Sequence, residues 1–415
     1  MSNTQRIRAF RTELNPNNKQ RSMFYRHAGC ARFVFNWGLQ RKKEVWWMNQ
    51  LPLPHIKTPT AIDLHRELVV RKKQDWGWMY EMSKCAPQEA LRDLDRAFKN
   101  FFENRTNFPR FKSRHDGVGS FRLTGRFQVE KDRVYLTRIG WVRLKERGYL
   151  PSAMHVLSIT ISERAGRWYA SLCVMDERLY SAPPPGEAVG VDLGITTLAT
   201  VSDGTVFENP RAMSRRLRKL KRLHREVSRK QEGSKNREKA KRRLSRAHVK
   251  TADLRRDAMH KATTTLARTK PIVVVESLRP QNMQRNHHLA QSVADASFGE
   301  FIRQMEYKCG WYGSRLVKAD PFYPSTKRCS NCGSLQEMPL SKRMYRCQSC
   351  GLVIERDLNA SRNLAMLAAS SAESLNACGG RRFMPETAGA ARGTRNLPAS
   401  VASVGAQVQE NGEGA

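Results

Sequence analysis

Acidic residues are scarce in this sequence, and long apolar runs are missing. Its 415 residues include 38 Asp and Glu against 74 Lys and Arg, which gives a formal net charge of +36. No segment approaches the roughly 20 consecutive apolar residues that a membrane-spanning helix requires. The first eleven residues are polar and basic, without the apolar core of a secretory signal. These absences predict a soluble intracellular protein with no membrane partner.

The excess of positive charge indicates a polyanionic partner. A globular protein with this charge repels itself unless a polyanion neutralises it, and nucleic acid is the usual one. A ribosomal-type protein or a merely solvated basic surface is the alternative that composition leaves open. Much of the charge lies in residues 211–250, which hold 18 Lys and Arg and three Glu. A narrow seam of leucines there predicts two long helices that break near Gly233.

Several common catalytic motifs are also missing: a phosphate-binding loop, His-Glu-x-x-His and Gly-x-Ser-x-Gly. The sequence instead offers three carboxylates in structured settings. Asp192 lies inside the apolar strand 189–195, Glu276 ends a valine-rich strand, and Asp357 opens a helix. In this order they indicate an RNase H-like nuclease, because two-metal phosphodiester hydrolysis needs about three converging carboxylates. Taken singly, Asp357 could be a helix cap and Glu276 a salt-bridge partner.

Four of the nine cysteines form two Cys-x-x-Cys pairs. Fourteen residues separate the pairs, and a glycine follows each one. Two such turns supply four thiolates in the tetrahedral arrangement of a structural zinc site; a redox dithiol or an iron–sulfur site is the alternative. The remaining cysteines are isolated, which suits a reducing compartment. The four predicted zinc ligands are Cys329, Cys332, Cys347 and Cys350.

The rest of the chain predicts both helices and strands. Period-two alternation over 118–180 is typical of a small antiparallel barrel or sheet, and 188–207 predicts three short strands. Helices are expected around 24–39, from Pro87, over 294–313 and over 357–369, with His287 and His288 in a polar loop. The last forty residues lack periodicity and predict disorder.

Together, five segments resemble the TnpB family, the transposon-encoded relatives of the type V CRISPR effectors. They are GVDLGITTLATVSDG, VVVESLRPQNM, FGEFIRQMEYKCGWYG, PSTKRCSNCG with CQSCG, and ERDLNASRNL. The resemblance extends over about residues 6–380. One departure is Ser361, where the family usually has alanine.

The resemblance implies an α+β multidomain protein. Its parts would be a β-barrel wedge domain, a helical recognition domain, and an RNase H-like (RuvC) nuclease with an inserted zinc ribbon. The implied boundaries are 1–14 and 116–185 for the wedge barrel, 15–115 for the recognition domain, 187–324 and 353–375 for the nuclease, 325–352 for the zinc ribbon, and 376–415 for a disordered tail.

The resemblance also implies a function. Members of the family bind a guide RNA from the transposon end, recognise a short transposon-adjacent motif and cleave guide-matched double-stranded DNA. Asp192, Glu276 and Asp357 match the catalytic positions and would hold two Mg²⁺ ions, beside one structural Zn²⁺. One protein chain per RNA, located in the cytoplasm with access to the nucleoid, is expected.

Nucleic-acid contacts are expected from two groups of residues. By the same resemblance, Lys84, Gln88 and Thr124 match positions that read the adjacent motif. The basic helices would contact phosphates in the positive channel that such complexes need. Their candidate residues are Arg215, Arg216, Arg218, Lys219, Arg222 and Arg225.

Two other functions share this fold and stay open. A nuclease-inactive relative could bind DNA through an RNA guide and act as a regulator, although the intact acidic triad argues against this. A guide-free DNA-processing enzyme of a transposon would be distinguished by the absence of a discrete bound RNA.

Overall fold

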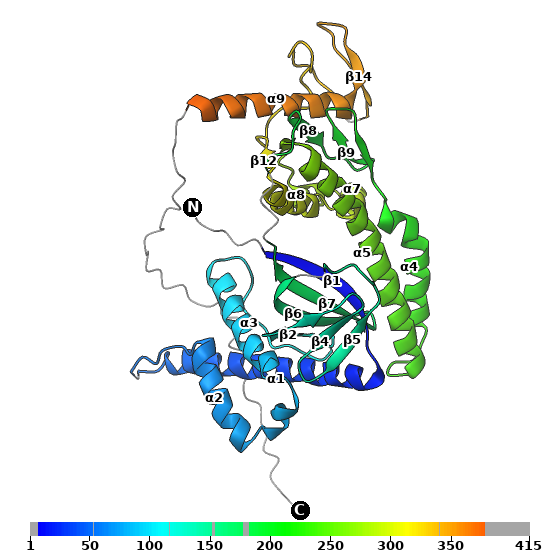
Figure 1. Cartoon of the computed structure of the whole chain (residues 1–415). Helices are drawn as coiled ribbons and strands as arrows, with labels where there is room; N and C mark the ends of the chain where they lie inside the picture. Colours follow the sequence, from blue (N-terminus) through cyan, green and yellow to red (C-terminus); the bar gives the residue numbers. More distant parts are fainter. Residues whose placement is uncertain are drawn as a thin grey trace, which may run out of the picture. The chain divides into compact units, whose positions relative to one another are not determined.

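The computed structural model describes residues 7–52, 54–115, 117–151, 154–176, 182–339 and 341–377. Within these ranges the chain contains both helices and strands, and the strands form three sheets (Figure 1). One sheet has seven strands, one has five, and the last is a short two-stranded ribbon. No helix in the described ranges is long and apolar enough to span a membrane.

The five-stranded sheet has the strand order β10-β9-β8-β11-β12. The central strand β8 is parallel to its neighbour β11, and β12 continues the parallel part beyond β11. Strand β9 is antiparallel to β8, as expected for the tight connection between them. Valine-rich β11 is buried along most of its length because it has neighbours on both sides. The bounds are β8 Val189–Asp192, β9 Thr197–Val201, β10 Val206–Glu208, β11 Ile272–Val275 and β12 Arg315–Lys318.

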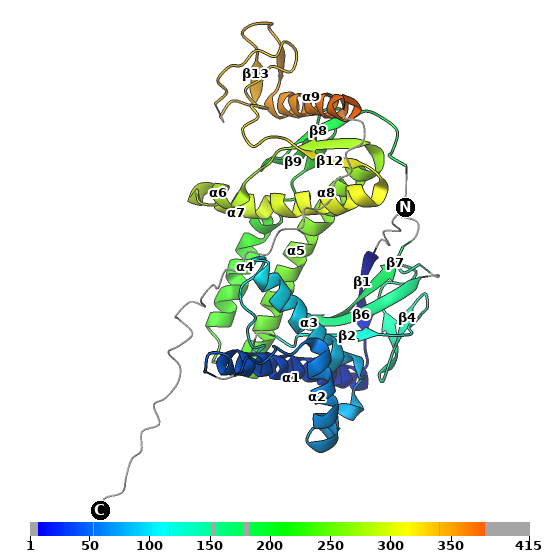
Figure 2. The same cartoon turned by 90° about the vertical axis from the view of Figure 1, so that its left-hand side faces the viewer.

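Helices connect the parallel strands, as parallel pairing requires. Between β8 and β11 the chain forms β9, β10 and the helices α4 (Ala212–Ser228) and α5 (Lys235–Thr269), which pack side by side as a hairpin (Figure 2). Between β11 and β12 it forms α6 (Pro280–Met283), α7 (His287–Ala296) and α8 (Phe298–Tyr312). The predicted break between two long basic helices near Gly233 is confirmed, with Ser234 capping α5.

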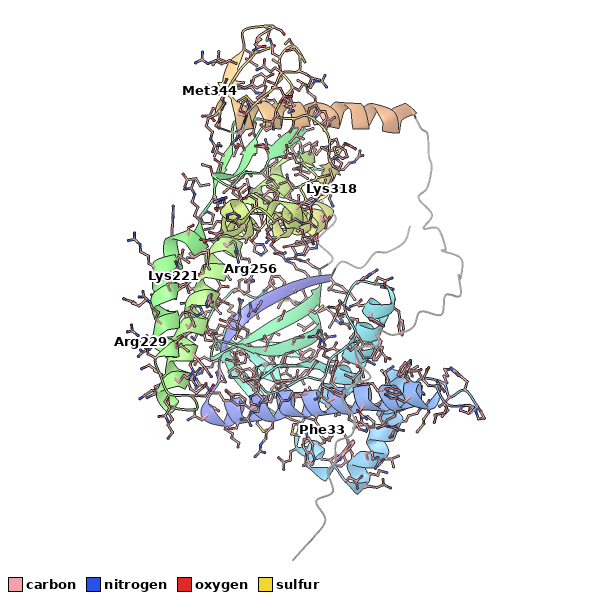
Figure 3. All side chains as sticks on the ribbon, turned by 180° about the vertical axis from the view of Figure 1, so that it is seen from behind. Phe33, Lys221, Arg229, Arg256, Lys318 and Met344 are labelled. Carbon is pink, nitrogen blue, oxygen red and sulfur yellow. The ribbon has the colours of Figure 1, made fainter. Side chains whose placement is uncertain are left out.

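The basic side chains of α4 lie mostly outside its packed seam. Leu220 and Leu223 are buried, whereas most arginines of this helix are exposed. Figure 3 labels Lys221 on α4 and Arg229 directly after it, with their side chains projecting outward. The hairpin therefore presents a strip of positive charge.

The last described helix, α9 (Arg356–Ala377), follows the two-stranded ribbon of β13 (Met344–Arg346) and β14 (Val353–Glu355). It extends beyond the predicted end near residue 369. From residue 378 onward the predicted disordered tail lies outside the described residues, as does Cys378.

The seven-stranded sheet is antiparallel throughout and has the order β2-β6-β7-β1-β5-β4-β3. Strand β1 pairs with both β7 and β5, so the beginning of the chain lies in the middle of the sheet. Buried and half-buried residues alternate along β7, because successive side chains point to opposite faces and one face packs against the core. The bounds are β1 Ile7–Asn15, β2 Ser120–Thr124, β3 Gln128–Val129, β4 Arg133–Leu136, β5 Gly140–Leu144, β6 His155–Arg164 and β7 Arg167–Met175.

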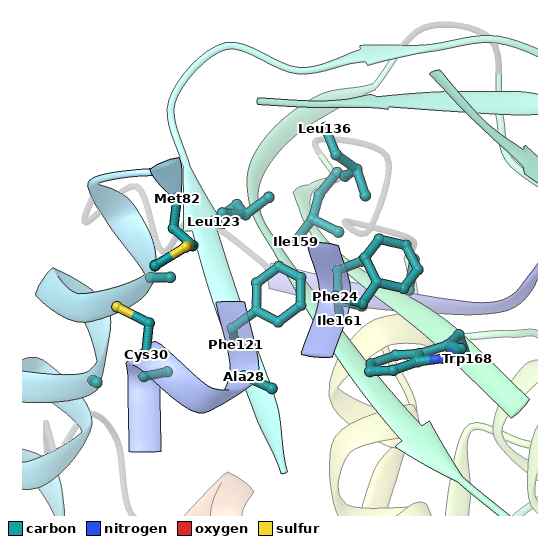
Figure 4. Packing of buried hydrophobic residues seen from close by; sticks show 14 of the residues in the cluster. Phe24, Ala28, Cys30, Met82, Phe121, Leu123, Leu136, Ile159, Ile161 and Trp168 are labelled. Atoms are coloured by element: carbon teal, nitrogen blue, oxygen red, sulfur yellow. The ribbon is translucent and has the colours of Figure 1, made fainter. Parts of the chain in front are cut away.

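Helices α1 (Asn18–Met48), α2 (Ala61–Gln74) and α3 (Cys85–Phe102), with the short 3₁₀ helix η1 (Gly77–Glu81), share a hydrophobic core with this sheet. Figure 4 shows Phe24 of α1 packed with Phe121 and Trp168 of the sheet. Asn17 and Gln20 form a capping box that fixes where α1 begins.

Three further sequence predictions differ from the structure. Helix α2 was not expected, although Thr60 and Asp63 form a readable capping box. The predicted helix 294–313 is instead two helices, because Ser297 adopts the left-handed conformation (φ 53°) between α7 and α8. His287 and His288 do not lie in a loop: they open α7, whose first turn is capped by the Asn286 side chain.

Candidate active site

Asp192 and Glu276 stand at the ends of adjacent parallel strands. Val191 of β8 pairs with Val275 of β11, so each acidic residue follows directly after a paired valine. Side chains alternate between the faces of a strand, so both carboxylates emerge on the face opposite to these two valines. Both are half-buried. The register of two strands that are far apart in sequence therefore places two carboxylates side by side.

Helix α9 covers the same face of the sheet. Gly190 lies two residues before Asp192 and thus on its face; a Cβ atom there would come within 2.7 Å of the Leu364 Cβ atom, and still closer to the Ser361 carbonyl oxygen and the Ala365 amide nitrogen. On the neighbouring strand, Val274 packs with Leu364. The glycine lets the helix backbone lie directly on the strand.

This packing brings the first turn of α9 to the carboxylates. Asp357 precedes Ser361 by four residues, which is about one helical turn. Ser361 lies over Gly190, and Gly190 is two residues before Asp192 on the same strand. The three acidic residues, on two strands and a helix, therefore lie near enough for their charges to act on one another. Their carboxylate oxygens are less tightly grouped than the four cysteine sulfurs, which form the one metal-ligand cluster among the described residues.

The electrostatics of the carboxylates reflect this convergence. Burial raises the pKa of Asp192 well above its usual range, and the charges of Glu276 and Asp357 raise it further, while Arg356 acts in the opposite direction. Burial also raises the pKa of Glu276; a hydrogen bond from Ser325 opposes that rise, and the charge of Asp357 adds to it. Three like charges in a partly buried site are unfavourable unless cations neutralise them.

The donor set suits hard divalent cations. All three candidate ligands offer carboxylate oxygens, which Mg²⁺ and Mn²⁺ prefer over the softer ligands that select zinc. Asp357 also accepts hydrogen bonds from its neighbour Arg356, whose Nη2 lies 3.0 Å from the Asp357 Oδ1 atom. The Arg356 guanidinium donates a further hydrogen bond to the Lys342 carbonyl, which ties the start of α9 to the loop before β13.

Glu276 is held by a residue that the sequence analysis did not identify. The Ser325 hydroxyl donates to the Glu276 Oε1 atom at 2.5 Å. Ser325 is buried, and its carbonyl accepts a hydrogen bond from the Asn363 side chain of α9 at 2.7 Å. The hydroxyl thereby fixes one of the two carboxylate oxygens of Glu276.

Two asparagines of α9 hold the loop that leads into the cysteine pairs. Asn363 also donates to the Arg328 carbonyl at 2.6 Å, and Asn359 donates to the same carbonyl at 2.8 Å. Asn359 in turn accepts from the Ser330 amide. Both asparagines are fully buried and one helical turn apart, a spacing that could have signalled a shared role.

The four predicted cysteines form one cluster. Their sulfur atoms all lie within 4.8 Å of one another. The Cys329–Cys350 and Cys332–Cys347 sulfur distances are 3.7 Å and 3.6 Å. A tetrahedral zinc site with Zn–S bonds of about 2.3 Å has sulfur separations of roughly 3.8 Å, so the geometry fits this ion. Both following glycines adopt positive φ, which allows the tight turn at each pair.

Comparisons with known proteins cover most of the chain. Three family models match: "Probable transposase" at residues 171–287, "Cas12f1-like, TNB domain" at 298–364, and "Helix-turn-helix domain" at 1–50. A "Putative RNA-guided DNA endonuclease" of Streptomyces pristinaespiralis is 36% identical over 90% of this chain and 91% of its own length. The chain belongs to the TnpB family.

Two further matches are with an Escherichia coli protein and a solved structure. The E. coli K12 protein, named "Putative RNA-guided DNA endonuclease InsQ", is 34% identical to this TnpB-family chain over 90% of the chain and 94% of its own length. A chain in a "Cryo-EM structure of the Cas12f1-sgRNA-target DNA complex" is 13% identical, with a TM-score of 0.46; the match covers 87% of this chain and 99% of that one.

The structure of this TnpB-family chain brings together the three residues predicted to read a DNA motif. Lys84 is exposed directly before α3, and Gln88 is half-buried in the first turn of that helix. Thr124 ends β2, and its carbonyl accepts a hydrogen bond from the Cys85 thiol. The start of α3 and the end of β2 therefore meet. Their role in DNA recognition stays a prediction.

The six basic residues predicted to contact phosphates lie on α4. Arg216 is half-buried and the others are exposed. Within the described ranges, none of the six forms an ion pair, so their charges are available to a polyanion. These residues are Arg215, Arg216, Arg218, Lys219, Arg222 and Arg225.

Proposed function

We propose that this chain is an RNA-guided DNA endonuclease that hydrolyses phosphodiester bonds with two Mg²⁺ ions. The observation that carries the proposal is the convergence of Asp192, Glu276 and Asp357 from two adjacent strands and a helix. The names of the relatives support an RNA guide and a DNA target. The positive charge supports nucleic acid as the partner.

Each residue has a distinct part in the proposed mechanism. When bound, the metal ions would activate the attacking water and stabilise the leaving oxygen. Asp192 lies on the central strand, where the charges of Glu276 and Asp357 both reach it, so it would hold the metal ions together with these two residues. Glu276 is oriented by the Ser325 hydroxyl, and Asp357 by the packing of α9 against Gly190.

The four cysteines would hold one structural zinc ion. Its proposed role is to fix the loop around Cys329, which Asn359 and Asn363 bind from the other side. Because Ser325 lies four residues before Cys329, a folded cysteine cluster would also keep its hydroxyl on Glu276. Loss of zinc would thus disturb the orientation of the Glu276 carboxylate in the acidic site.

Purified protein is expected to carry a discrete RNA and to cleave only DNA that matches it. The reason is that base pairing with the guide supplies the sequence specificity, whereas the protein contacts phosphates. The measurement is sequencing of the co-purified RNA, followed by cleavage assays with matched and scrambled DNA. Cleavage that persists after RNase treatment and removal of RNA would identify a guide-free DNA-processing enzyme instead.

Replacing Cys329 and Cys347 together by serine is expected to remove zinc and abolish cleavage. Without the ion, the loop between Ser325 and Cys329 should lose its fixed conformation, since structural zinc contributes folding energy directly. Elemental analysis should find about one zinc per wild-type chain and none in the variant. Cys173→Ser is the matched control and should keep its zinc. Iron in the wild-type protein, or no metal, would contradict this prediction.

A further inference from the structure

A pocket of about 580 Å³ lies between α1 and η1, away from the residues of the proposed catalytic site. Its lining includes two arginines, Arg26 and Arg32, and two aromatic residues, Phe33 and Trp78. Gly29 of α1 also lines it. Neither the acidic site nor the cysteine cluster uses any of these residues.

The aromatic rings in this pocket are fixed in position yet exposed. Phe33 makes edge-to-face contacts with Trp76 and Trp78, at centroid distances of 5.0 Å and 5.7 Å. Even so, Phe33 is 39% and Trp78 is 44% exposed (Phe33 is labelled in Figure 3). Rigid aromatic surfaces of this kind are the usual platforms on which unpaired bases stack.

Gly29 has no evident structural reason to be glycine. It lies inside the long helix α1, where glycine is less favourable than alanine, and a Cβ atom there would meet nothing within 4 Å. Gly38 of the same helix is a useful contrast, because a Cβ atom at that position would come within 2.8 Å of the Leu91 side chain. A ligand that approaches the helix backbone closely would account for Gly29.

The charged groups of the pocket favour a phosphate-bearing ligand. Arg26 is paired with Glu81 at 2.6 Å. Arg32 donates a hydrogen bond to the Val118 carbonyl at 3.3 Å, and within the described ranges it forms no ion pair. Its remaining donors are therefore available to a phosphate, which guanidinium groups bind well.

We infer that this pocket binds an unpaired nucleotide, with its base against Phe33 and Trp78 and its phosphate at Arg32. The inference rests on the proposed function in one respect: that function supplies the source of the nucleotide, which is a guide RNA or the target DNA. Close contact of the nucleotide with the Gly29 backbone explains the missing side chain.

The test is equilibrium binding of the full chain, freed of RNA, to short labelled oligothymidylate, oligouridylate and a duplex of equal length, across a range of salt. Phe33→Ala should weaken single-strand binding about tenfold at every salt concentration, because a stacked base is lost. The slope against salt should not change, since it reports phosphate contacts. Phe33→Trp should bind normally.

Gly29→Ala gives a second readout that a merely structural role would not produce. The variant should unfold at a higher temperature than the wild type, because alanine is the better helix former, and yet bind single strands several-fold more weakly. Gly299→Ala, in helix α8, is the matched control: it also has open space around the added Cβ, and it should leave binding unchanged.

The outcomes separate the possibilities. A loss confined to oligouridylate identifies the RNA as the source of the nucleotide, and a loss confined to oligothymidylate identifies the DNA. Wild-type affinity of Phe33→Ala and Gly29→Ala for both single strands overturns the inference, and so does an equal loss on the duplex. The assay needs no cleavage, so failure of the proposed endonuclease function would leave its result unaffected.

Discussion

Replacing Asp192 with asparagine is expected to slow RNA-guided DNA cleavage by at least about 1,000-fold. The amide keeps the shape of the side chain but removes the charge that would bind the metal ions. Guide and target affinity should stay within a few-fold of wild type, because phosphate contacts are expected from other residues. Single-turnover cleavage and equilibrium binding, measured on the same preparation, separate the two effects.

Although Asp192→Asn should slow cleavage, it should make the metal-free protein more stable against thermal unfolding. Without divalent metal, Asp192→Asn should unfold at a higher temperature than the wild type, because it removes a buried charge beside Glu276 and Asp357. Adding Mg²⁺ should stabilise the wild type more than the variant. Asp203→Asn, in the turn between β9 and β10, breaks the ion pair with Lys270; it is the control and should leave cleavage intact. Cleavage near the wild-type rate in Asp192→Asn would refute the catalytic assignment.

Gly190→Ala is expected to reduce cleavage by roughly 100-fold or more without touching a carboxylate. The added methyl group would collide with the backbone of α9 at Ser361 and Ala365, so the helix must move away from the strand. Asp357 would move with it. A misplacement of about 1 Å is enough to cost a factor of this size in an active site.

The two closest collisions at Gly190 are with backbone atoms of α9, and this determines which variants can relieve them. Shortening the side chains of α9 cannot relieve it, so Ala365→Gly should not restore activity. Gly310→Ala is the control, because an added Cβ atom there meets nothing within 4 Å. Circular dichroism and guide binding would show that Gly190→Ala still folds. A folded variant that cleaves at the wild-type rate would mean that α9 does not position Asp357.

Local patterns predicted most of the strands and helices around the site. The run 188–207 forms three short strands, and the valine-rich segment before Glu276 is a buried central strand, as expected. In one place a single residue overturned the prediction. Ser297 breaks a continuous apolar pattern through its backbone conformation, and the pattern itself gives no sign of it.

The supporting residues of the site could not be predicted in the same way. Ser325 reads as an ordinary loop serine until its hydroxyl is seen on Glu276, 49 residues away in sequence. Nothing in the sequence distinguishes Asn359 and Asn363 from other polar helix residues. Their role follows from the hydrogen bonds that both donate to the Arg328 carbonyl, in the loop before the cysteine cluster. These roles depend on partners brought together only by folding.

The sequence by itself determined the chemistry available to this protein: three carboxylates in structured settings, four cysteines in two tight turns, and a concentrated positive charge. These features are local, because residue type, spacing and periodicity express them directly. Only the tertiary structure decided that β8 and β11 are neighbours in register, that α9 lies on Gly190, and that Ser325 reaches Glu276. Strand order and helix packing arise from contacts between residues far apart in the chain, and no local pattern specifies them.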